Sequence, residues 1–288
     1  QMGLDVLRAQ DGSRAPLTVQ GRRDLRALSY DSPIASAQVK SAILLAGLWA
    51  EGETSVREPH PSRDHTERML AFLGRPPGPG AIHVPGDLSS AAFILGAAML
   101  IPGSQVTVQG VGVNPTRTGF LEVVKTMGAR VSRSNEQERN GEPFADLTLT
   151  QGPLTGARIA GALTVRAIDE LPLVATIATQ AQGPTVIRDA GELRVKESDR
   201  IARTVAMLQS FGVPVDEHLD GLTVHGDPDR ALHSGEVDAR GDHRIAMCGF
   251  LLGLLAPGTQ VRGAHSVRSS FPEFAATLRA VGAEMSEP

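Results

Sequence analysis

Hydrophobic and polar positions along the chain follow one pattern that occurs four times. Each occurrence opens with a helical stretch of small and apolar residues and passes through a glycine-containing turn into a short β-branched run. A polar loop then leads to a second, amphipathic helix. The opening helices are expected over residues 41–50, 89–100, 171–181 and 244–255, and the β-branched runs over 54–56, 106–108, 185–187 and 259–261.

The second helix of each repeat is expected to end at a glycine, because glycine is the usual residue just past a helix C-terminus. These glycines are Gly74, Gly128, Gly212 and Gly282. Residues 2–6 look like one more such stop and the strand after it, without the preceding helix. Each repeat corresponds to a β-α-β-α-β-β unit, and we interpret the sequence as part of a longer protein that is incomplete at its N-terminus.

A segment rich in proline and glycine, residues 74–80, interrupts the repeats and predicts a domain boundary near residue 85. Residues 1–85 would be the incomplete remainder of one repeat domain. Residues 86–288 would form a second repeat domain that lacks its first strand. A wide turn is the alternative to a boundary. The polar stretch 133–144 is expected to be a solvated hairpin loop.

Composition narrows the class of protein. The net charge of −4 provides no global basic field for nucleic acid, and no apolar run reaches the ~18 residues that a membrane span needs. The single cysteine, Cys248, stands in an apolar helix and is expected to be a buried small hydrophobe. One cysteine excludes an intrachain disulfide framework and is typical of a reducing cytosol.

Charged residues gather where the predicted helices begin. Lys196 and Arg200 precede the second helix of the third repeat, four residues apart, with Glu197 between them. On a helical turn the two cations share a face, and helix N-termini bind anions. The alternative is a surface ion-pair network.

The opening helices also begin with polar residues. Ser and Asp at these positions are explained by helix capping, but capping requires neither Arg244 nor the doubled acid Asp169-Glu170. An arginine at a helix entrance can hold a carboxylate or phosphate through two hydrogen bonds. The sequence has no Cys/His metal spacing, no phosphate-binding P-loop and no dinucleotide glycine fingerprint. Neither a metal site nor a covalent serine mechanism is therefore expected.

At these residues the chain resembles the EPSP synthase (3-phosphoshikimate 1-carboxyvinyltransferase) family. The matching strings are SAQVKSAILLAG (36–47), SRDHTERML (62–70), IDELP (168–172), LRVKESDRI (193–201) and GDHRIAM (241–247). The resemblance implies an α/β fold, an inside-out α/β barrel of six β-α-β-α-β-β units in two domains, with the active site in the cleft between the domains.

The resemblance also implies the reaction. The family transfers the carboxyvinyl group of phosphoenolpyruvate to the 5-hydroxyl of shikimate 3-phosphate and releases phosphate, a step in the biosynthesis of chorismate and the aromatic amino acids. No cofactor and no metal are implied. The expected partners are these two small molecules, with no nucleic acid and no membrane, and the enzyme is expected to be a cytoplasmic monomer.

Individual residues receive roles from the same resemblance. Asp169 would take the proton of the 5-hydroxyl, and Glu197 would act in proton transfer at the vinyl carbon. Shikimate 3-phosphate would be bound by Ser36, Ala37, Gln38, Arg63, Asp169 and Lys196. Phosphoenolpyruvate would be bound by Gln38, Arg200, His243 and Arg244. Many relatives carry a lysine where this chain has Ser269, so a basic contact is either lost or supplied by Arg268.

Two other functions stay open. The sister enolpyruvyl transferase that acts on UDP-N-acetylglucosamine shares the repeat architecture, although the IDELP and RVKESDR strings argue against it. A non-catalytic remnant that binds anions is the alternative outside the enzymes. Because the N-terminal family segments are not present, the 288-residue chain by itself is expected to show no carboxyvinyl transfer.

Overall fold

The computed structural model describes residues 1–8, 16–74 and 81–285. It divides into two compact units, Gln1–His83 and Val84–Pro288. The division falls close to the expected boundary near residue 85. Residues 75–80 of the Pro/Gly-rich segment, which suggested that boundary, lie outside the described residues. That the two units are separate domains stays a prediction.

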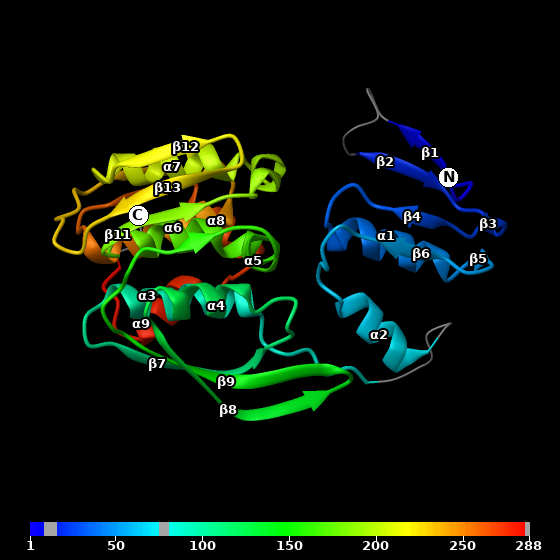
Figure 1. Ribbon diagram of the computed structural model, residues 1–288, viewed down its shortest axis with the longest axis horizontal. Coiled ribbons are helices and arrows are strands. Elements are labelled where there is room, and N and C mark those ends of the chain that lie inside the picture. Colours follow the sequence, from blue (N-terminus) through cyan, green and yellow to red (C-terminus); the bar gives the residue numbers. More distant parts are fainter. Residues whose placement is uncertain (9–15, 75–80, 286–288) are drawn as a thin grey trace. The chain divides into compact units, whose positions relative to one another are not determined.

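The smaller unit consists of short strands and two helices (Figure 1). Strands β1 (Asp5–Arg8) and β2 (Leu17–Gln20) form an antiparallel hairpin. Two parallel strand pairs follow. In each pair, one strand precedes helix α1 in the chain and the other strand follows it. These elements are β3 (Leu25–Arg26) with β5 (Ala50–Glu51), β4 (Ser29–Asp31) with β6 (Ser55–Arg57), α1 (Ala37–Gly47) and α2 (His65–Leu73).

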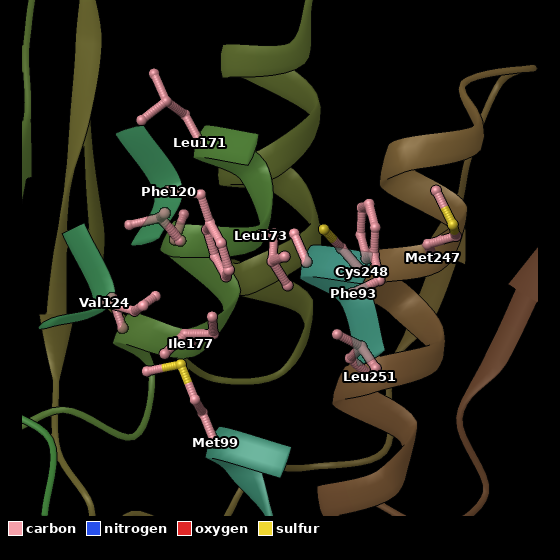
Figure 2. Packing of buried hydrophobic residues seen from close by; sticks show 14 of the residues in the cluster. Phe93, Met99, Phe120, Val124, Leu171, Leu173, Ile177, Met247, Cys248 and Leu251 are labelled. Carbon is pink, nitrogen blue, oxygen red and sulfur yellow. The ribbon is translucent and has the colours of Figure 1, made fainter. Parts of the chain in front are cut away.

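Three buried helices form the centre of the larger unit. They are α3 (Leu88–Leu100), α6 (Leu171–Ala178) and α8 (His243–Leu255). Their residues are small or apolar on every side, so each helix can be surrounded by other elements instead of facing water. Figure 2 shows Phe93 of α3, Leu173 of α6 and Cys248 of α8 close together in this core. Burial raises the pKa of the Cys248 thiol to about 12, which confirms that this cysteine is a buried hydrophobe.

Sheets flank the central helices of this unit. One sheet has the order β7-β9-β8 and another the order β10-β11-β13-β12, and in Figure 1 α3, α4 and α6 lie between them. The strands are β7 (Gln105–Gly112), β8 (Arg130–Arg139), β9 (Glu142–Thr150), β10 (Arg158–Ile159), β11 (Gly183–Ile187), β12 (Val215–His218), β13 (Gly221–Gly226) and the parallel pair β14 (Glu236–Asp238) and β15 (Gln260–Arg262). Helices inside and sheets outside are the inside-out arrangement expected from the sequence.

Shorter or amphipathic helices complete the unit. They are α4 (Gly119–Thr126), α5 (Ala162–Ala167), α7 (Arg200–Ser210), α9 (Phe274–Ala280) and the 3₁₀ turns η1 (Ile168–Glu170), η2 (Gly191–Val195) and η3 (Ala264–Ser269). Within the described residues no helix is both long and apolar enough to cross a membrane.

The predicted helix stops are confirmed. Gly74, Gly128, Gly212 and Gly282 all have positive φ angles, between 80° and 103°. Gly3, before β1, has a φ of 91° as well. Glycine adopts this conformation without the steric cost that a Cβ would bring, so it suits the position just past each helix, where the chain changes direction.

Residues 133–144 form a hairpin, as expected, but the expectation that this stretch is a loop was wrong. Strands β8 and β9 continue through most of this stretch and are joined by Asn140 and Gly141, with φ angles of 55° and 78°. An Asn-Gly pair with positive φ at both residues is a favoured two-residue hairpin turn. The strand signal was weak because β8 is exposed along nearly its whole length and therefore lacks alternating apolar residues.

We predict that Gly119→Ala destabilises the larger unit. A Cβ on Gly119 would stand 2.5 Å from the carbonyl carbon of Arg166, so α4 and α5 would have to separate. The expected loss is about 1–3 kcal/mol in the free energy of unfolding, measured by urea denaturation. Gly191→Ala is the matched control, because a Cβ there meets no atom within 4 Å. Equal stability of the two variants would contradict the packing argument.

Candidate functional site

The three central helices of the larger unit begin next to one another, and each beginning is acidic. Asp87 caps α3 by accepting a hydrogen bond from the Ser90 amide at 2.8 Å. Asp242 caps α8 by accepting from the Arg244 amide at 3.0 Å. Turn η1, which contains Asp169 and Glu170, leads into α6. Arg200 joins the entrances of α8 and α6 through Asp242 and Asp169, and a hydrogen bond from Ser89 to Glu170 joins the entrance of α3 to that of α6.

Arg200 lies at the centre of this group. It is the first residue of α7, is only 1% exposed, and contacts carboxylates from three segments. Its Nε donates to Asp242 Oδ2 at 2.9 Å, its Nη1 donates to Asp169 Oδ1 at 3.3 Å, and its Nη2 donates to Glu197. Ser198 adds a hydroxyl hydrogen bond to Asp242 at 2.9 Å. A buried guanidinium is tolerated here because several acceptors satisfy it.

The pKa of Asp242 reflects this pairing. Burial acts to raise the pKa, but the hydrogen bond and the positive charge of Arg200 outweigh it and hold the pKa of Asp242 below its usual range. The carboxyl is therefore ionised near neutral pH. A fully buried carboxylate and a nearly fully buried guanidinium thus form a fixed pair at the entrance to α8.

Arg244 lies on the same entrance and is held by the turn before α6. Its Nη1 donates to the backbone carbonyl of Asp169 at 3.0 Å and stands 3.5 Å from Glu170 Oε1. Glu170 is buried, and it also accepts from the Ser89 hydroxyl at 2.5 Å. A polar connection therefore runs from α8 through η1 to α3.

The connection continues to Arg117, in the loop before α4. Its Nη2 donates to the Ser89 hydroxyl at 2.5 Å and lies 3.3 Å from Asp87 Oδ1. Burial acts to raise the pKa of Asp87, but the charge of Arg117 and hydrogen bonds from Ser90 outweigh it and keep that pKa low. Arg117 therefore holds the α3 entrance, as Arg200 holds the entrance of α8.

His243 and Lys196 complete the group that the sequence predicts in this unit. Burial and the neighbouring charge of Arg244 lower the pKa of His243, so its imidazole is neutral at pH 7 and offers hydrogen bonds without a charge. Lys196 follows η2, and its Nζ lies 2.6 Å from Glu192 Oε1 and 3.9 Å from Asp169 Oδ1. Both cations of the Lys196–Arg200 segment thus approach Asp169.

The smaller unit brings its own predicted residues to the N-terminus of α1. Ser36 is the N-cap and its hydroxyl accepts from the Val39 amide at 3.5 Å, while Ala37 and Gln38 begin the helix. Arg63 directly follows Ser62 in the chain. Ser62 is joined to Ser36 through Glu58, which accepts hydrogen bonds from both.

The structure therefore groups the predicted residues within each unit. The larger unit brings together Asp169, Lys196, Glu197, Arg200, His243 and Arg244, and the smaller unit brings together Ser36, Ala37, Gln38 and Arg63. Sequence analysis missed the residues that hold them: Glu58, Ser89, Arg117, Glu170 and Asp242. Ser89 and Asp242 were attributed to helix capping, so their contacts with other segments were not considered. No local sequence signal connects Arg117 with α3. The doubled acid Asp169-Glu170 was noticed, but the separate role of Glu170 was not.

Two other sequence observations have structural counterparts. Ser269 ends η3, where its hydroxyl donates to the Ser266 carbonyl at 2.7 Å, and the neighbouring Arg268 is exposed. In the described part of the chain, no group of three or more His, Cys, Asp or Glu residues could hold a metal ion. The chemistry available here is hydrogen bonding, positive charge and carboxylates that can carry protons.

We predict that Asp242→Asn strongly destabilises the protein at pH 7, by about 3–5 kcal/mol, because it leaves Arg200 buried without its fully buried carboxylate partner. The direction of the pH dependence follows from the lowered pKa of Asp242. The ionised carboxylate contributes its full stabilisation to the folded state above the pKa of an aspartate in the unfolded chain, about 3.9. This contribution is lost as pH falls through the pKa of Asp242 in the folded state. The difference between wild type and variant, measured by urea unfolding, should shrink below about pH 4.

Asp238→Asn is the control for that experiment, because its ion pair with Arg240 is exposed and should contribute little. A large and similar loss in the free energy of unfolding in both variants would contradict the special role of the buried Arg200–Asp242 pair.

Comparison with known proteins shows the family to which the chain belongs. A family model described as EPSP synthase (3-phosphoshikimate 1-carboxyvinyltransferase) matches residues 1–278. A 3-phosphoshikimate 1-carboxyvinyltransferase of an Anaeromyxobacter species is 51% identical over 96% of this chain and 68% of its own length. The Brevibacillus brevis protein of the same name is 47% identical over 95% of this chain and 67% of its own length.

Solved structures give the same result. EPSP synthase from Acinetobacter baumannii superimposes with a TM-score of 0.84 at 40% identity, over 98% of this chain and 68% of that one. The enolpyruvyl transferase NikO from Streptomyces tendae, at 20% identity and a TM-score of 0.75, shares the fold. The chain belongs to the EPSP synthase (3-phosphoshikimate 1-carboxyvinyltransferase) family.

Proposed function

We propose that this protein transfers the carboxyvinyl group of phosphoenolpyruvate to the 5-hydroxyl of shikimate 3-phosphate, releasing phosphate. The observation that carries the proposal is the cluster of Lys196, Arg200 and Arg244 around Asp169, in a chain of this family. Both substrates are anions, and the two proton transfers of addition and elimination require carboxylates beside the cations. We further propose a cytoplasmic monomer that needs no cofactor.

Phosphoenolpyruvate is assigned to Arg200 and Arg244, with His243 and Gln38 as hydrogen-bonding residues. Arg244 is held at the α8 entrance through the Asp169 carbonyl, and the remaining N–H groups of its guanidinium can turn to a ligand. Arg200 is already surrounded by carboxylates. A ligand carboxylate therefore reaches Arg200 by replacing one of them.

Glu197 is the carboxylate that can be replaced. Its side chain is 51% exposed, whereas the side chains of Asp169 and Asp242 are 13% and 0% exposed. When phosphoenolpyruvate pairs with Arg200, Glu197 is released from its ion pair and becomes available to deliver a proton to the vinyl carbon and later to remove one. Binding and proton transfer are coupled through the same guanidinium.

Asp169 is proposed as the base that receives the proton of the 5-hydroxyl. Its carboxylate lies between Arg200 Nη1 and Lys196 Nζ, at 3.3 and 3.9 Å, and its own backbone carbonyl holds Arg244. One residue thus contacts all three cations. Lys196 is assigned to the binding of shikimate 3-phosphate.

The remaining contacts to shikimate 3-phosphate are assigned to the smaller unit. The amides at the start of α1 and the side chains of Ser36, Gln38 and Arg63 provide donors for its phosphate and ring hydroxyls. Ala37 contributes its backbone amide. A phosphate at a helix N-terminus is favoured by the free N–H groups and the helix dipole.

An acceptor comparison tests the proposal. For this test and for the turnover test below, the chain is supplied together with the N-terminal segments of the family, without which no carboxyvinyl transfer is expected. The protein is incubated with phosphoenolpyruvate and either shikimate 3-phosphate or UDP-N-acetylglucosamine. Phosphate release and product mass are measured, together with binding of each acceptor by calorimetry. We expect binding and phosphate release when shikimate 3-phosphate is the acceptor, and neither when UDP-N-acetylglucosamine is the acceptor. Reaction with the nucleotide sugar would favour the sister transferase, and anion binding without any carboxyvinyl product would favour a non-catalytic role.

Arg244→Ala is predicted to weaken phosphoenolpyruvate binding by about 2–4 kcal/mol, because a charge-assisted contact is lost. Binding of shikimate 3-phosphate should change much less. Calorimetric titration of each ligand separately makes the comparison. Arg262→Ala is the control, because Arg262 forms an exposed ion pair with Glu236 away from these helix entrances. Equal loss of affinity for both ligands would contradict the assignment of Arg244.

Glu197→Gln is predicted to slow turnover by about 10²–10⁴-fold while ligand affinities stay within a few-fold of wild type. The amide keeps the shape of the side chain but cannot carry the proton to the vinyl carbon. In this variant, the rate at which solvent deuterium enters the methylene group of phosphoenolpyruvate should fall by a similar factor to the rate of product formation. A variant with near-normal turnover would remove Glu197 from the mechanism.

A further inference from the structure

Glu58 occupies the centre of the α1 entrance in the smaller unit, and none of the proposed substrate contacts involves it. Its side chain is 7% exposed and accepts hydrogen bonds from Ser36, 22 residues earlier in the chain, and from Ser62, four residues later in the same loop. The Ser36 amide donates to Oε1 at 2.9 Å, and the Ser62 hydroxyl lies 2.8 Å from each carboxylate oxygen. One carboxylate therefore ties the N-cap of α1 to the loop that carries Arg63.

A buried lysine balances this carboxylate. Lys40, one turn into α1, places its Nζ 3.1 Å from Glu58 Oε2 and 3.4 Å from the Ser62 carbonyl. Burial acts to lower the pKa of Lys40, but its hydrogen bonds to Glu67 and Glu58 outweigh it and raise that pKa. The lysine is therefore charged, and it offsets part of the negative charge of Glu58 and Glu67 near the helix N-terminus to which the phosphate of shikimate 3-phosphate is assigned.

Glu67 provides an internal comparison. It also pairs with Lys40, at 2.8 Å, but it approaches from α2, and within the described residues of the smaller unit it forms no hydrogen bond with Ser36 or Ser62. Loss of Glu67 and loss of Glu58 each remove one negative partner of Lys40. Only loss of Glu58 also frees the two segments that carry Ser36 and Arg63.

We propose that Glu58 is a positioning residue for shikimate 3-phosphate, which sets the distance between the N-terminus of α1 and Arg63 and is held in place by its ion pair with Lys40. The inference rests on the function proposed above for the smaller unit. Glu58 does not touch the substrate. It holds the donors that do, so its removal changes the affinity for shikimate 3-phosphate and leaves the phosphoenolpyruvate contacts of the larger unit unchanged.

The test compares Glu58→Gln with Glu67→Gln. For wild type and both variants, calorimetry gives the dissociation constants of shikimate 3-phosphate and phosphoenolpyruvate, and thermal unfolding monitors folding. Glu58→Gln should weaken shikimate 3-phosphate binding by about 10-fold or more, the scale expected for lost hydrogen bonds to a charged group. Phosphoenolpyruvate affinity should stay within about 2-fold, and Glu67→Gln should leave both affinities within about 2-fold.

The outcomes are distinct. Unchanged shikimate 3-phosphate affinity in folded Glu58→Gln, or an equal loss in both variants, would overturn the positioning role. Wild-type protein that binds no shikimate 3-phosphate would instead overturn the proposed function. If Glu58→Gln does not fold, Ser62→Ala removes the hydroxyl hydrogen bond to Glu58 while the Lys40 ion pair is kept. This variant must show the same selective loss, and an unchanged affinity would again contradict the proposal.

Discussion

The larger unit depends on one buried ion pair, between Arg200 and Asp242. Arg200 begins α7 and Asp242 caps α8, so their contact fixes the start of one amphipathic helix against the start of a central one. A buried charge without its partner is strongly destabilising, whereas the pair together adds little to stability over an apolar substitute. The value of the pair is therefore geometric, because it holds Arg200 at a single position beside Asp169 and Glu197.

The inside-out arrangement explains why the pair lies where it does. Central helices that are apolar on every side have no polar surface along their length, so polar side chains can enter only at their ends. The neighbouring N-termini of α3, α6 and α8 add free N–H groups at one end. Acidic caps satisfy some of these groups, and arginines then join the caps. The candidate site of the larger unit therefore lies where the apolar central helices begin.

Sequence reasoning predicted the elements whose signals are local. The central helices were placed correctly because an apolar stretch with a capping residue needs no distant partner. Sequence reasoning missed strand β8, whose exposed residues do not alternate. It also began α1 four residues late, because residues 37–40 were assigned to the helix entrance and they form the first turn of the helix. The family strings located the candidate residues. They could not show that Asp242 pairs with a residue 42 positions away, or that Glu58 joins Ser36 to Ser62.

The two arginines of the candidate site differ in a way that bears on the mechanism. Arg244 contacts a backbone carbonyl and the buried Glu170, so a ligand can add to its hydrogen bonds without displacing a carboxylate. Arg200 pairs with the exposed Glu197, so a ligand must compete. Under the proposed assignment, phosphoenolpyruvate that occupies Arg244 first would gain Arg200 only as Glu197 leaves. Glu197, proposed to carry the proton, would then be released only when the substrate is in place, which would limit proton transfer to the complex.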